Sequence, residues 1–459
     1  MNREIRLPEI MTVLSITFLG IAAGIIVFNT ALIGLVLGIF VAMVVCKKNG
    51  YTLLQLWQMI KIGAGSAKVI LTIMSLIGML SASWMLSGTI AAMMNLGFDY
   101  LTRMNALLAF FVITSIISLI LGTSIGSISV IGIPFMEIGN TIGIPLPLIA
   151  GAIISGAYVG DRTSPISSSV NLTAAMTNTQ VMDNIKIMLK TLWPVYLACM
   201  AFYFVLGREY TLLEDSIYHI TTIQTMLDQH YTISWYTYLP PILLMGFALL
   251  RFPILYCILV GIFSSVVITL STTDIGGIEI LKTLIFGYTP ENVSLNNIIS
   301  GGGWLSMIDV ILIILFSTAL NGILEHTKMI EPLIDIFVKK IKTARELVLK
   351  TSVLCVIINA ITCNQSLSII IPGKFLKTEY QKKGLSKNHL SRTIADSGVV
   401  TVPLLPWNVN ALAIVAILGV GTLSYTPYAL LCYLLPIVTV AYGYLKPVNN
   451  QIRNNAHLT

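Results

Sequence analysis

Two carboxylates interrupt long apolar stretches of this chain. Asp161 lies in "SGAYVGDRTSPISSSVNLT" and Asp396 lies in "IADSGVVTVPLLPWNVNALA", and both stretches are rich in serine, threonine, glycine and proline. A carboxylate inside an apolar segment can hold either a proton or a cation, while hydroxyls and freed backbone carbonyls supply oxygen ligands for sodium. The two stretches therefore predict a site at which a proton and a sodium ion compete, with Asp161 and Asp396 as sodium ligands.

Other interpretations of the same charged residues stay open. Asp161 and Asp396 could be solvated charges at helix ends, which need no bound ion. Arg162 could pair with Asp161, attract the carboxylate of a substrate, or act as a structural counter-ion. Prolines at positions 165 and 403 end a helix, and irregular backbone at membrane depth must face protein or a watery cavity.

The elements that must position these groups are membrane helices. Of 459 residues, 56% are hydrophobic and 10% are charged, whereas soluble domains are about 25% charged. Five apolar windows are long enough to cross a bilayer as helices: Ile10–Phe28, Val69–Leu86, Leu192–Leu206, Phe252–Leu270 and Val310–Leu324. The composition predicts an all-α polytopic membrane protein with about 10 crossing helices.

Two further apolar segments read as re-entrant hairpins with small, polar tips. Asn105–Ile138 contains "LGTSIGSISVIG" and Leu347–Leu376 contains "NAITCNQSLSIIIPG". Thr123 precedes Thr362 by nearly the same interval as Pro165 precedes Pro403. Each hairpin is thus followed by a broken helix, which predicts two inverted-topology repeats with a binding site near the midplane.

The positions of basic residues predict the orientation. Basic residues concentrate in three connections and in the tail: Lys47, Lys48, Lys61 and Lys68; Lys339, Lys340, Lys342 and Arg345; Lys374, Lys377, Lys382, Lys383 and Lys387; and Lys446 and Arg453. Because basic residues favour cytoplasmic connections, these segments and both termini should lie in the cytoplasm.

The expected organisation follows from these segments. It comprises two N-terminal helices and a cytoplasmic connector (1–68), repeat 1 with hairpin 105–138 and broken helix 147–178 (69–206), external loops and central helices (207–304), repeat 2 with hairpin 347–376 and broken helix 391–420 (305–445), and a cytoplasmic tail (446–459).

The predicted site gathers polar residues of the two hairpin tips and the two breaks. We expect alternating access of one central site formed by Thr123, Ser124, Ser127, Asp161, Arg162, Ser164, Ser167, Ser168, Asn171, Asn364, Gln365, Asp396, Thr401 and Asn408. Their matched placement favours a site over simple helix-packing contacts.

These motifs resemble those of the NhaC-type sodium/proton antiporter family. The resemblance covers nearly the whole length and is densest in "LGTSIGSISVIGIPF", in "SGAYVGDRTSPISSSVNL" and in the segment from Asn364 to Asn408. It implies an exchanger of the bacterial inner membrane, built from inverted repeats with re-entrant hairpins and belonging to the ion-transporter superfamily. Three positions depart from the family pattern: Ser168 and Asn364 stand where acids are usual, and Arg162 stands where lysine is usual.

The resulting prediction is a cation-coupled secondary antiporter that exchanges sodium, protons or both. Because of these three departures from the family pattern, a second interpretation stays open: a sodium- or proton-coupled carrier of an amino acid or carboxylate, such as a malate/lactate exchanger. A channel is the rival from another class. No enzyme activity, cofactor or nucleic-acid partner is expected; the predicted partners are small ions or solutes and the lipid bilayer, and a homodimer stays open.

Overall fold

The computed structural model describes residues 5–28, 30–101, 104–210, 214–290, 293–296, 299–332 and 341–445. Lys339, Lys340, Lys446 and Arg453, and the predicted tail 446–459, lie outside these ranges. The described residues form helices and connections, and no strand is found among them. The α-helices are α1 (Leu7–Phe28), α2 (Leu32–Lys48), α3 (Leu53–Ser66), α4 (Lys68–Leu86), α5 (Thr89–Leu101), α6 (Ala106–Leu121), α7 (Ser124–Thr141), α8 (Leu146–Thr163), α9 (Ser168–Thr177), α10 (Val181–Gly207), α11 (Glu214–His230), α12 (Leu239–Leu249), α13 (Ile254–Thr272), α14 (Gly277–Phe286), α15 (Val293–Asn296), α16 (Ile308–His326), α18 (Ala344–Thr362), α19 (Gln365–Phe375), α20 (Lys377–Lys382), α21 (Lys387–Ile394), α22 (Val409–Leu418), α23 (Thr422–Tyr425) and α24 (Leu430–Leu445).

The predicted all-α polytopic architecture is confirmed. Five described helices are long and apolar enough to cross a membrane, and they contain most of each of the five apolar windows predicted from the sequence. Two further pairs are apolar helices bent at a short break, by 49° between Lys387–Leu404 and Val409–Leu418 and by 58° between Thr422–Tyr428 and Leu430–Tyr442. The count of ten crossings stays a prediction, because length and composition identify five helices, or seven with each bent pair as one span.

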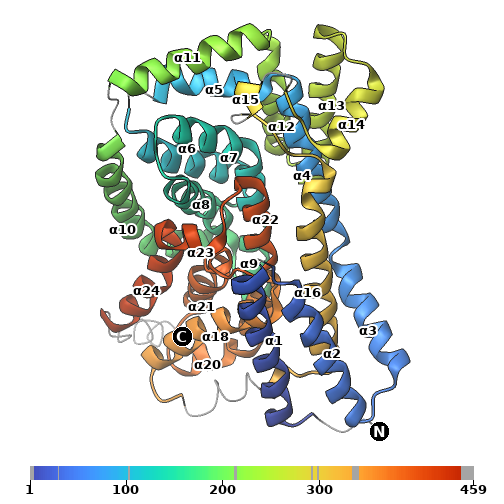
Figure 1. The fold of residues 1–459 in the computed structure, drawn as a ribbon. Coiled ribbons are helices and arrows are strands. Elements are labelled where there is room, and N and C mark those ends of the chain that lie inside the picture. The colour runs from blue at the N-terminus through green and yellow to red at the C-terminus, as the bar shows by residue number, and fades with distance from the viewer. Residues whose placement is uncertain are drawn as a thin grey trace.

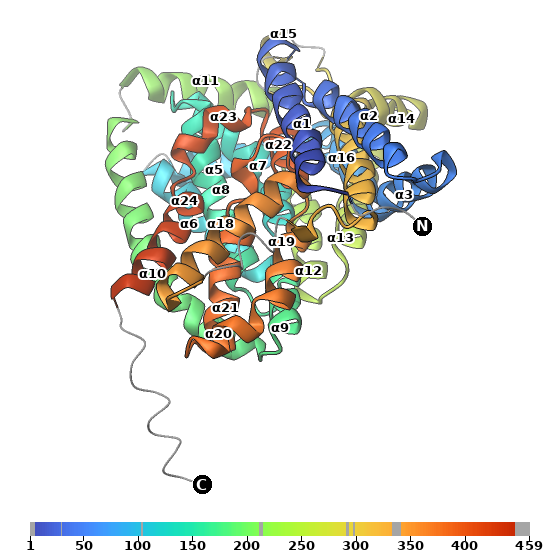
Figure 2. The ribbon, with the colours of Figure 1, turned by 90° about the horizontal axis from the view of Figure 1, so that it is seen from below.

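Glycines allow the helices on one side of the molecule to pack closely. Helices α1, α2, α3 and α16 lie together on the side opposite α10 and α24 (Figure 1; Figure 2). A Cβ atom on Gly20 of α1 would lie 2.9 Å from the Cα of Gly34 in α2. A Cβ on Gly63 of α3 would lie 2.7 Å from the Cα of Gly322 in α16. Only glycine permits these backbone distances.

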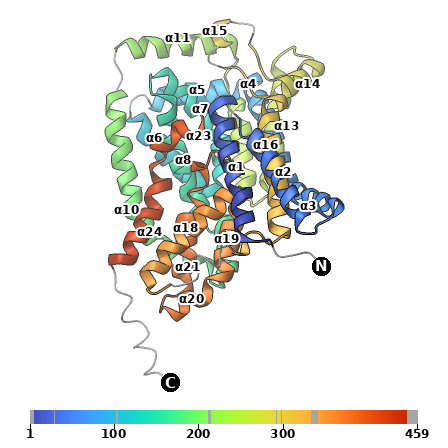
Figure 3. The same ribbon diagram turned by 60° about the horizontal axis from the view of Figure 1, so that its bottom comes forward.

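The two predicted hairpins share one tip geometry. In the first, α6 ends at Gly122 in the left-handed conformation, and Thr123 caps α7 by accepting from the Gly126 backbone N–H. In the second, α18 ends at Cys363, also left-handed, and Asn364 caps α19. Helices α6 and α7 lie toward one end of the molecule and α18 and α19 toward the other, so the hairpins approach each other from opposite ends (Figure 3).

The two predicted breaks also match. Helix α8 ends at Thr163 and α9 begins at Ser168, with Ser167 as its N-cap. In the second break, α21 continues into a π-helical turn (Ala395–Val399), and α22 begins after the N-cap Asn408. The interval from Thr123 to Asn364 equals that from Ser167 to Asn408. The structural repeat therefore pairs Thr123 with Asn364, two residues beyond Thr362, because the helix caps rather than the threonines occupy equivalent positions.

Each hairpin holds the broken helix of its own repeat through a buried side chain. Ser118 of α6 donates to the carbonyl of Ala157 in α8. At the equivalent place, Asn359 of α18 donates to the carbonyl of Gly398, at 2.7 Å. Buried carbonyls in an apolar interior need such partners, so the two contacts fix the depth of each tip against its break.

Candidate functional site

The carboxylate of Asp161 lies where the two hairpin tips and the first break meet. The side chain is 4% exposed. Its Oδ2 atom accepts hydrogen bonds from the Ser124 hydroxyl of hairpin one at 3.0 Å and from the Gln365 amide of hairpin two at 3.4 Å. Its Oδ1 atom accepts from Ser169 at 3.0 Å and from Ser167 at 3.3 Å. One carboxylate thus joins residues of both repeats.

Three helices begin at this carboxylate. Ser124 is the first residue of α7, Gln365 is the first residue of α19, and Ser169 lies in the first turn of α9. Helix N-termini carry a partial positive charge and unpaired N–H groups, so they favour negative charge beside them. The fold therefore places a negative group at a point where three helix ends stabilise it.

Tyr158 adds a further oxygen to this region. It lies three residues before Asp161 on α8, is fully buried, and is close to both Asp161 and Ser124. Its hydroxyl forms no well-aligned hydrogen bond among the described residues, although it lies close enough to Ser124 to interact with it. Buried hydroxyls normally have a partner, so this oxygen is available to an ion or water that reaches Asp161.

The amide of Gln365 connects the site to the second break. Its Nε2 atom donates to Asp161, and its Oε1 atom accepts from Asn410 in the first turn of α22, at 2.8 Å. Asn408 caps the same helix and also donates to the Asn359 carbonyl at 3.2 Å. The second break therefore reaches Asp161 through one intervening side chain.

Arg162 and Asp396 form a second, separate cluster. Both side chains are fully buried, and the Arg162 guanidinium forms an ion pair with the Asp396 carboxylate. The carboxylate also accepts from Thr191 of α10, at 2.9 Å, and from Thr439 of α24. The guanidinium donates to the Met188 carbonyl at 3.0 Å and to Thr191 at 2.9 Å. All these partners satisfy the two charges, as buried ion pairs require.

The one central site expected from the sequence is therefore divided in the structure. Arg162 pairs with Asp396 rather than with Asp161, because consecutive residues of a helix point in different directions. Asp396 already has a cationic partner, so its environment differs from that of Asp161, for which no ion pair is found in the described ranges. A sodium ion at Asp396 would face a buried guanidinium, and the role of Asp396 as a sodium ligand stays a prediction.

The other predicted residues shape the tips and breaks. Thr123, Asn364 and Asn408 cap helices, while Ser127, Ser164 and Thr401 donate to the carbonyls of Thr123, Leu119 and Ser397, respectively. Ser168 and Asn171 are exposed, and Asn171 donates to the carbonyls of Pro165 and Ser167. These contacts are structural, and none of them reaches the Asp161 carboxylate.

Sequence reasoning missed several residues that the structure places beside the two carboxylates. Ser169 contacts Asp161 where Ser168 was expected, because α9 begins at Ser168 and its first turn directs Ser169 inward. Tyr158 could have been found from its spacing of three residues on the helix that carries Asp161. Thr191 and Thr439 lie far from Asp396 in the chain, and no local pattern indicates them.

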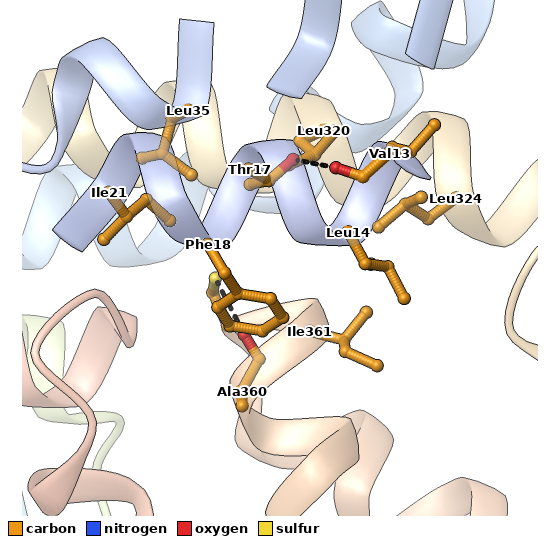
Figure 4. Close-up of a pocket in the computed structure, with 11 residues that line it drawn as sticks. Val13, Leu14, Thr17, Phe18, Ile21, Leu35, Leu320, Leu324, Ala360 and Ile361 are labelled. Atoms are coloured by element: carbon orange, nitrogen blue, oxygen red, sulfur yellow. Dashed lines mark hydrogen bonds between the residues drawn. The ribbon is translucent and has the colours of Figure 1, made fainter. Parts of the chain in front are cut away.

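A small cavity between α1, α2, α16 and α18 does not belong to this site. It is lined by apolar side chains, including Leu14, Ile21 and Leu320, and its volume is about 10 Å³ (Figure 4). That space holds one water at most. Within the described ranges, no group of three or more His, Cys, Asp or Glu side chains is placed to hold a metal ion, so any cation would rely on hydroxyl, amide and carbonyl oxygens.

Comparison with known proteins identifies the family. The profile described as "Na+/H+ antiporter family" matches residues 156–446, which include both breaks and the second hairpin. The chain is 29% identical to the Na(+)/H(+) antiporter NhaC of Alkalihalophilus pseudofirmus, over 81% of each chain. It is 28% identical to the malate-2H(+)/Na(+)-lactate antiporter of Bacillus subtilis, over 99% of this chain and 98% of that one. It is 33% identical to the arginine/ornithine antiporter ArcD of Halobacterium salinarum, over 94% of this chain and 89% of that one. This multi-pass membrane protein, with its paired hairpins and broken helices, therefore belongs to the Na+/H+ antiporter family, a family of transporters rather than of enzymes.

Proposed function

We propose that the protein exchanges sodium ions for protons, and that Asp161 carries each ion in turn. The observation that supports this most directly is that Asp161 is shared by both hairpin tips and lacks the buried cation that neutralises Asp396. A proton and a sodium ion cannot both occupy one carboxylate. Sodium arriving from one side therefore displaces the proton, which is the coupling that an antiporter needs.

The surrounding oxygens suit this role. The hydroxyls of Ser124, Ser167 and Ser169 donate to Asp161 as described, and each can rotate to turn a lone pair toward a cation instead. The Tyr158 hydroxyl supplies one more oxygen. Such a ligand set favours an alkali cation over transition metals, which prefer imidazole or thiolate.

Alternating access would act through the hairpin tips. Because α7 and α19 both contact Asp161 with their first residues, withdrawal of either tip would open the carboxylate toward one end of the molecule. Neutralising the charge of Asp161 by a proton or a cation lowers the cost of separating it from those helix ends. This explains why the empty, charged site would resist opening.

We further propose that the two repeats have opposite orientations in the cytoplasmic membrane, with both termini in the cytoplasm. Lys47 and Lys48 end α2, and Lys377, Lys382 and Lys383 lie in or directly after α20. Basic residues concentrate in cytoplasmic connections. Fusing a reporter that is active only in the cytoplasm to each terminus tests the orientation; an inactive reporter at either end would contradict it.

Reconstituted vesicles with an internal pH-sensitive dye test the proposed exchange. We expect Asp161→Asn to reduce sodium-driven proton movement to the level of empty vesicles, while Asp161→Glu retains part of it. Asp183→Asn is the matched control, because Asp183 is a half-exposed carboxylate paired with Lys186 on α10. Wild-type exchange by Asp161→Asn would refute the role assigned to Asp161.

A further inference from the structure

Arg392 is a buried arginine for which the described part of the chain provides no counter-ion. The residue is 2% exposed, its guanidinium forms no ion pair there, and its Nε atom has no hydrogen-bond partner. The nearby Arg162, in contrast, is paired with Asp396. A buried charge normally has a partner, because its removal from water is costly. The charge of Arg392 therefore needs an anion that these residues do not supply.

The side chain of Arg392 lies where α10, α21 and α24 pack together. Asp396 follows Arg392 in the chain by about one helical turn, and Tyr442 follows Thr439, which donates to Asp396, by a similar interval. The guanidinium carbon lies 5.1 Å from the centre of the Tyr442 ring. An aromatic face attracts a cation but does not neutralise it. Arg392 thus lies one turn beyond the Arg162–Asp396 pair, toward the end of the molecule where α20 lies (Figure 3).

Two further basic residues lie close to Arg392. His389 precedes it by three residues on α21, so the two share one face of the helix. Both Arg392 and Lys190 of α10 lie within electrostatic range of His389. Lys190 is exposed and forms no ion pair with any described residue. Arg392 and Lys190 therefore give this end of the three helices a positive charge that attracts anions.

The surface beside this basic cluster is apolar and faces outward. Lys190, Trp193 and Leu197 follow one another at helical spacing on α10, and all three are exposed. Ile437 of α24 is exposed as well. Most of the apolar window of α10 is not buried inside the molecule. A basic residue followed by tryptophan and then by apolar residues is the order in which a helix passes from lipid headgroups into hydrocarbon. The basic cluster therefore lies at the depth of the headgroups.

We propose that Arg392 binds the phosphate group of an anionic phospholipid that enters between α10, α21 and α24. The guanidinium fork matches phosphate oxygens with parallel N–H donors, and Lys190 attracts the same group from the exposed side. Trp193 and Leu197 would contact the acyl chains, which a free phosphate ion lacks. Basic pockets between membrane helices bind such headgroups on the cytoplasmic side, in agreement with the orientation proposed above. This lipid site is separate from Asp161 and goes beyond the proposed exchange of ions.

Thermal denaturation of delipidated protein in a neutral detergent tests the proposal, because a bound lipid stabilises the folded state. The protein is titrated with phosphatidylglycerol, with inorganic phosphate, or with phosphatidylcholine, whose choline group neutralises its phosphate. We expect phosphatidylglycerol to raise the midpoint of wild-type protein most. Arg392→Gln should weaken its binding by about 10- to 100-fold, the loss expected for hydrogen bonds to a charged group. Lys190→Gln should weaken it by about fivefold, because a basic residue at the surface contributes less.

Two controls separate lipid binding from net charge and from folding. Arg251→Gln removes the charge of an exposed arginine in the turn between α12 and α13 and should leave phosphatidylglycerol binding unchanged. Without lipid, Arg392→Gln should melt at or above the midpoint of wild-type protein, because it removes a buried charge that lacks a counter-ion. If Arg392 only packs against Tyr442, the variant should instead melt lower and keep its affinity for the lipid, which would overturn the inference.

Other outcomes would also overturn it. These are equal stabilisation of wild-type protein by the two lipids, equal stabilisation by inorganic phosphate at the same phosphate concentration, and equal losses of lipid binding in Arg392→Gln and Arg251→Gln. Sodium-driven proton movement is measured separately, in vesicles. Its absence from wild-type vesicles would count against the role of Asp161 and not against the lipid site.

Discussion

Replacing Asp396 with asparagine tests the assignment of the Arg162–Asp396 pair as a buried structural pair. Both side chains are fully buried. The substitution removes the negative charge and leaves the guanidinium of Arg162 without its counter-ion. It also places an amide N–H₂ group where Asp396 now accepts from the hydroxyls of Thr191 and Thr439. The amide N–H₂ group of the asparagine would then face the hydroxyl groups that now donate to Asp396, and these hydrogen bonds would be lost.

The expected loss follows from the energetics of broken ion pairs. Removing one partner of a buried pair costs about 3–5 kcal/mol, because an uncompensated charge remains in the interior. This corresponds to a change of roughly 150- to 5,000-fold in the ratio of folded to unfolded protein, since about 1.4 kcal/mol is a factor of ten. Removing both charges, as in Arg162→Met with Asp396→Leu, should recover most of the loss, because apolar replacements of buried pairs are often neutral.

Thermal denaturation of the purified variants in detergent provides the assay. We expect the midpoint of Asp396→Asn to fall by several degrees or more, that of the double variant to lie closer to wild type, and that of Asp183→Asn to remain nearly unchanged, because the exposed Asp183–Lys186 pair contributes about 0–1 kcal/mol. A stable Asp396→Asn variant that has lost transport would refute this reasoning. It would return Asp396 to the role of an ion ligand, as predicted from the sequence.

Two further predictions concern the tips and the break. Gly122→Ala should destabilise the protein by about 1–3 kcal/mol and slow transport, because Gly122 has φ +66° and an added Cβ would meet Ile166. Gly143→Ala is the control, because Gly143 has φ +79° but no atom within 4 Å of an added Cβ. In the same melting and vesicle assays, this control measures the effect of the left-handed backbone without the contact to Ile166. Equal effects of the two variants would contradict the tip contact. Ser169→Ala should weaken sodium binding by about 10- to 100-fold in sodium-dependent thermal stabilisation, because it removes a hydroxyl oxygen proposed to turn toward the cation beside Asp161, whereas Ser168→Ala on the exposed side should not. The reverse order would refute the side-chain directions described here.

The sequence predicted the elements of the fold because each has a local signal. The five long helices follow from uninterrupted apolar windows, and the structure contains helices there. The hairpin tips and breaks follow from small, polar and proline residues inside apolar segments, such as Gly122 and Pro165, which end helices wherever they occur. The division into domains was predicted from the same signals and stays a prediction.

The sequence could not predict which side chains meet. Ser167, Ser168 and Ser169 are chemically alike, and only the position at which α9 begins determines that Ser169 faces Asp161 and Ser168 faces outward. Helix starts predicted from sequence are uncertain by a few residues, and each residue rotates the side chain by about 100° around the axis. One position of uncertainty was enough to exchange the two serines.

The pairing of Arg162 with Asp396 has a different reason for being missed. The two residues belong to different repeats, and no local pattern relates an arginine in one break to an aspartate in the other. Asp396 also lies within the π-helical turn from Ala395 to Val399, where the side-chain spacing differs from that of a regular α-helix. Long-range pairing and an irregular turn both lie beyond what residue spacing can indicate.

The equivalent positions of the two repeats are consistent with the unequal roles proposed for the two carboxylates. The interval that relates Ser118 to Asn359 relates Ser155, not Asp161, to Asp396. Ser155 accepts from Tyr203 of α10, and Asp396 accepts from Thr439 of α24, so both positions attach a broken helix to a neighbouring helix. Asp161 has no acidic counterpart in the second repeat, where Gln365 reaches across to it instead. A site with one uncompensated carboxylate can hold one monovalent cation or one proton at a time, and this is the condition under which the two ions must exchange rather than travel together.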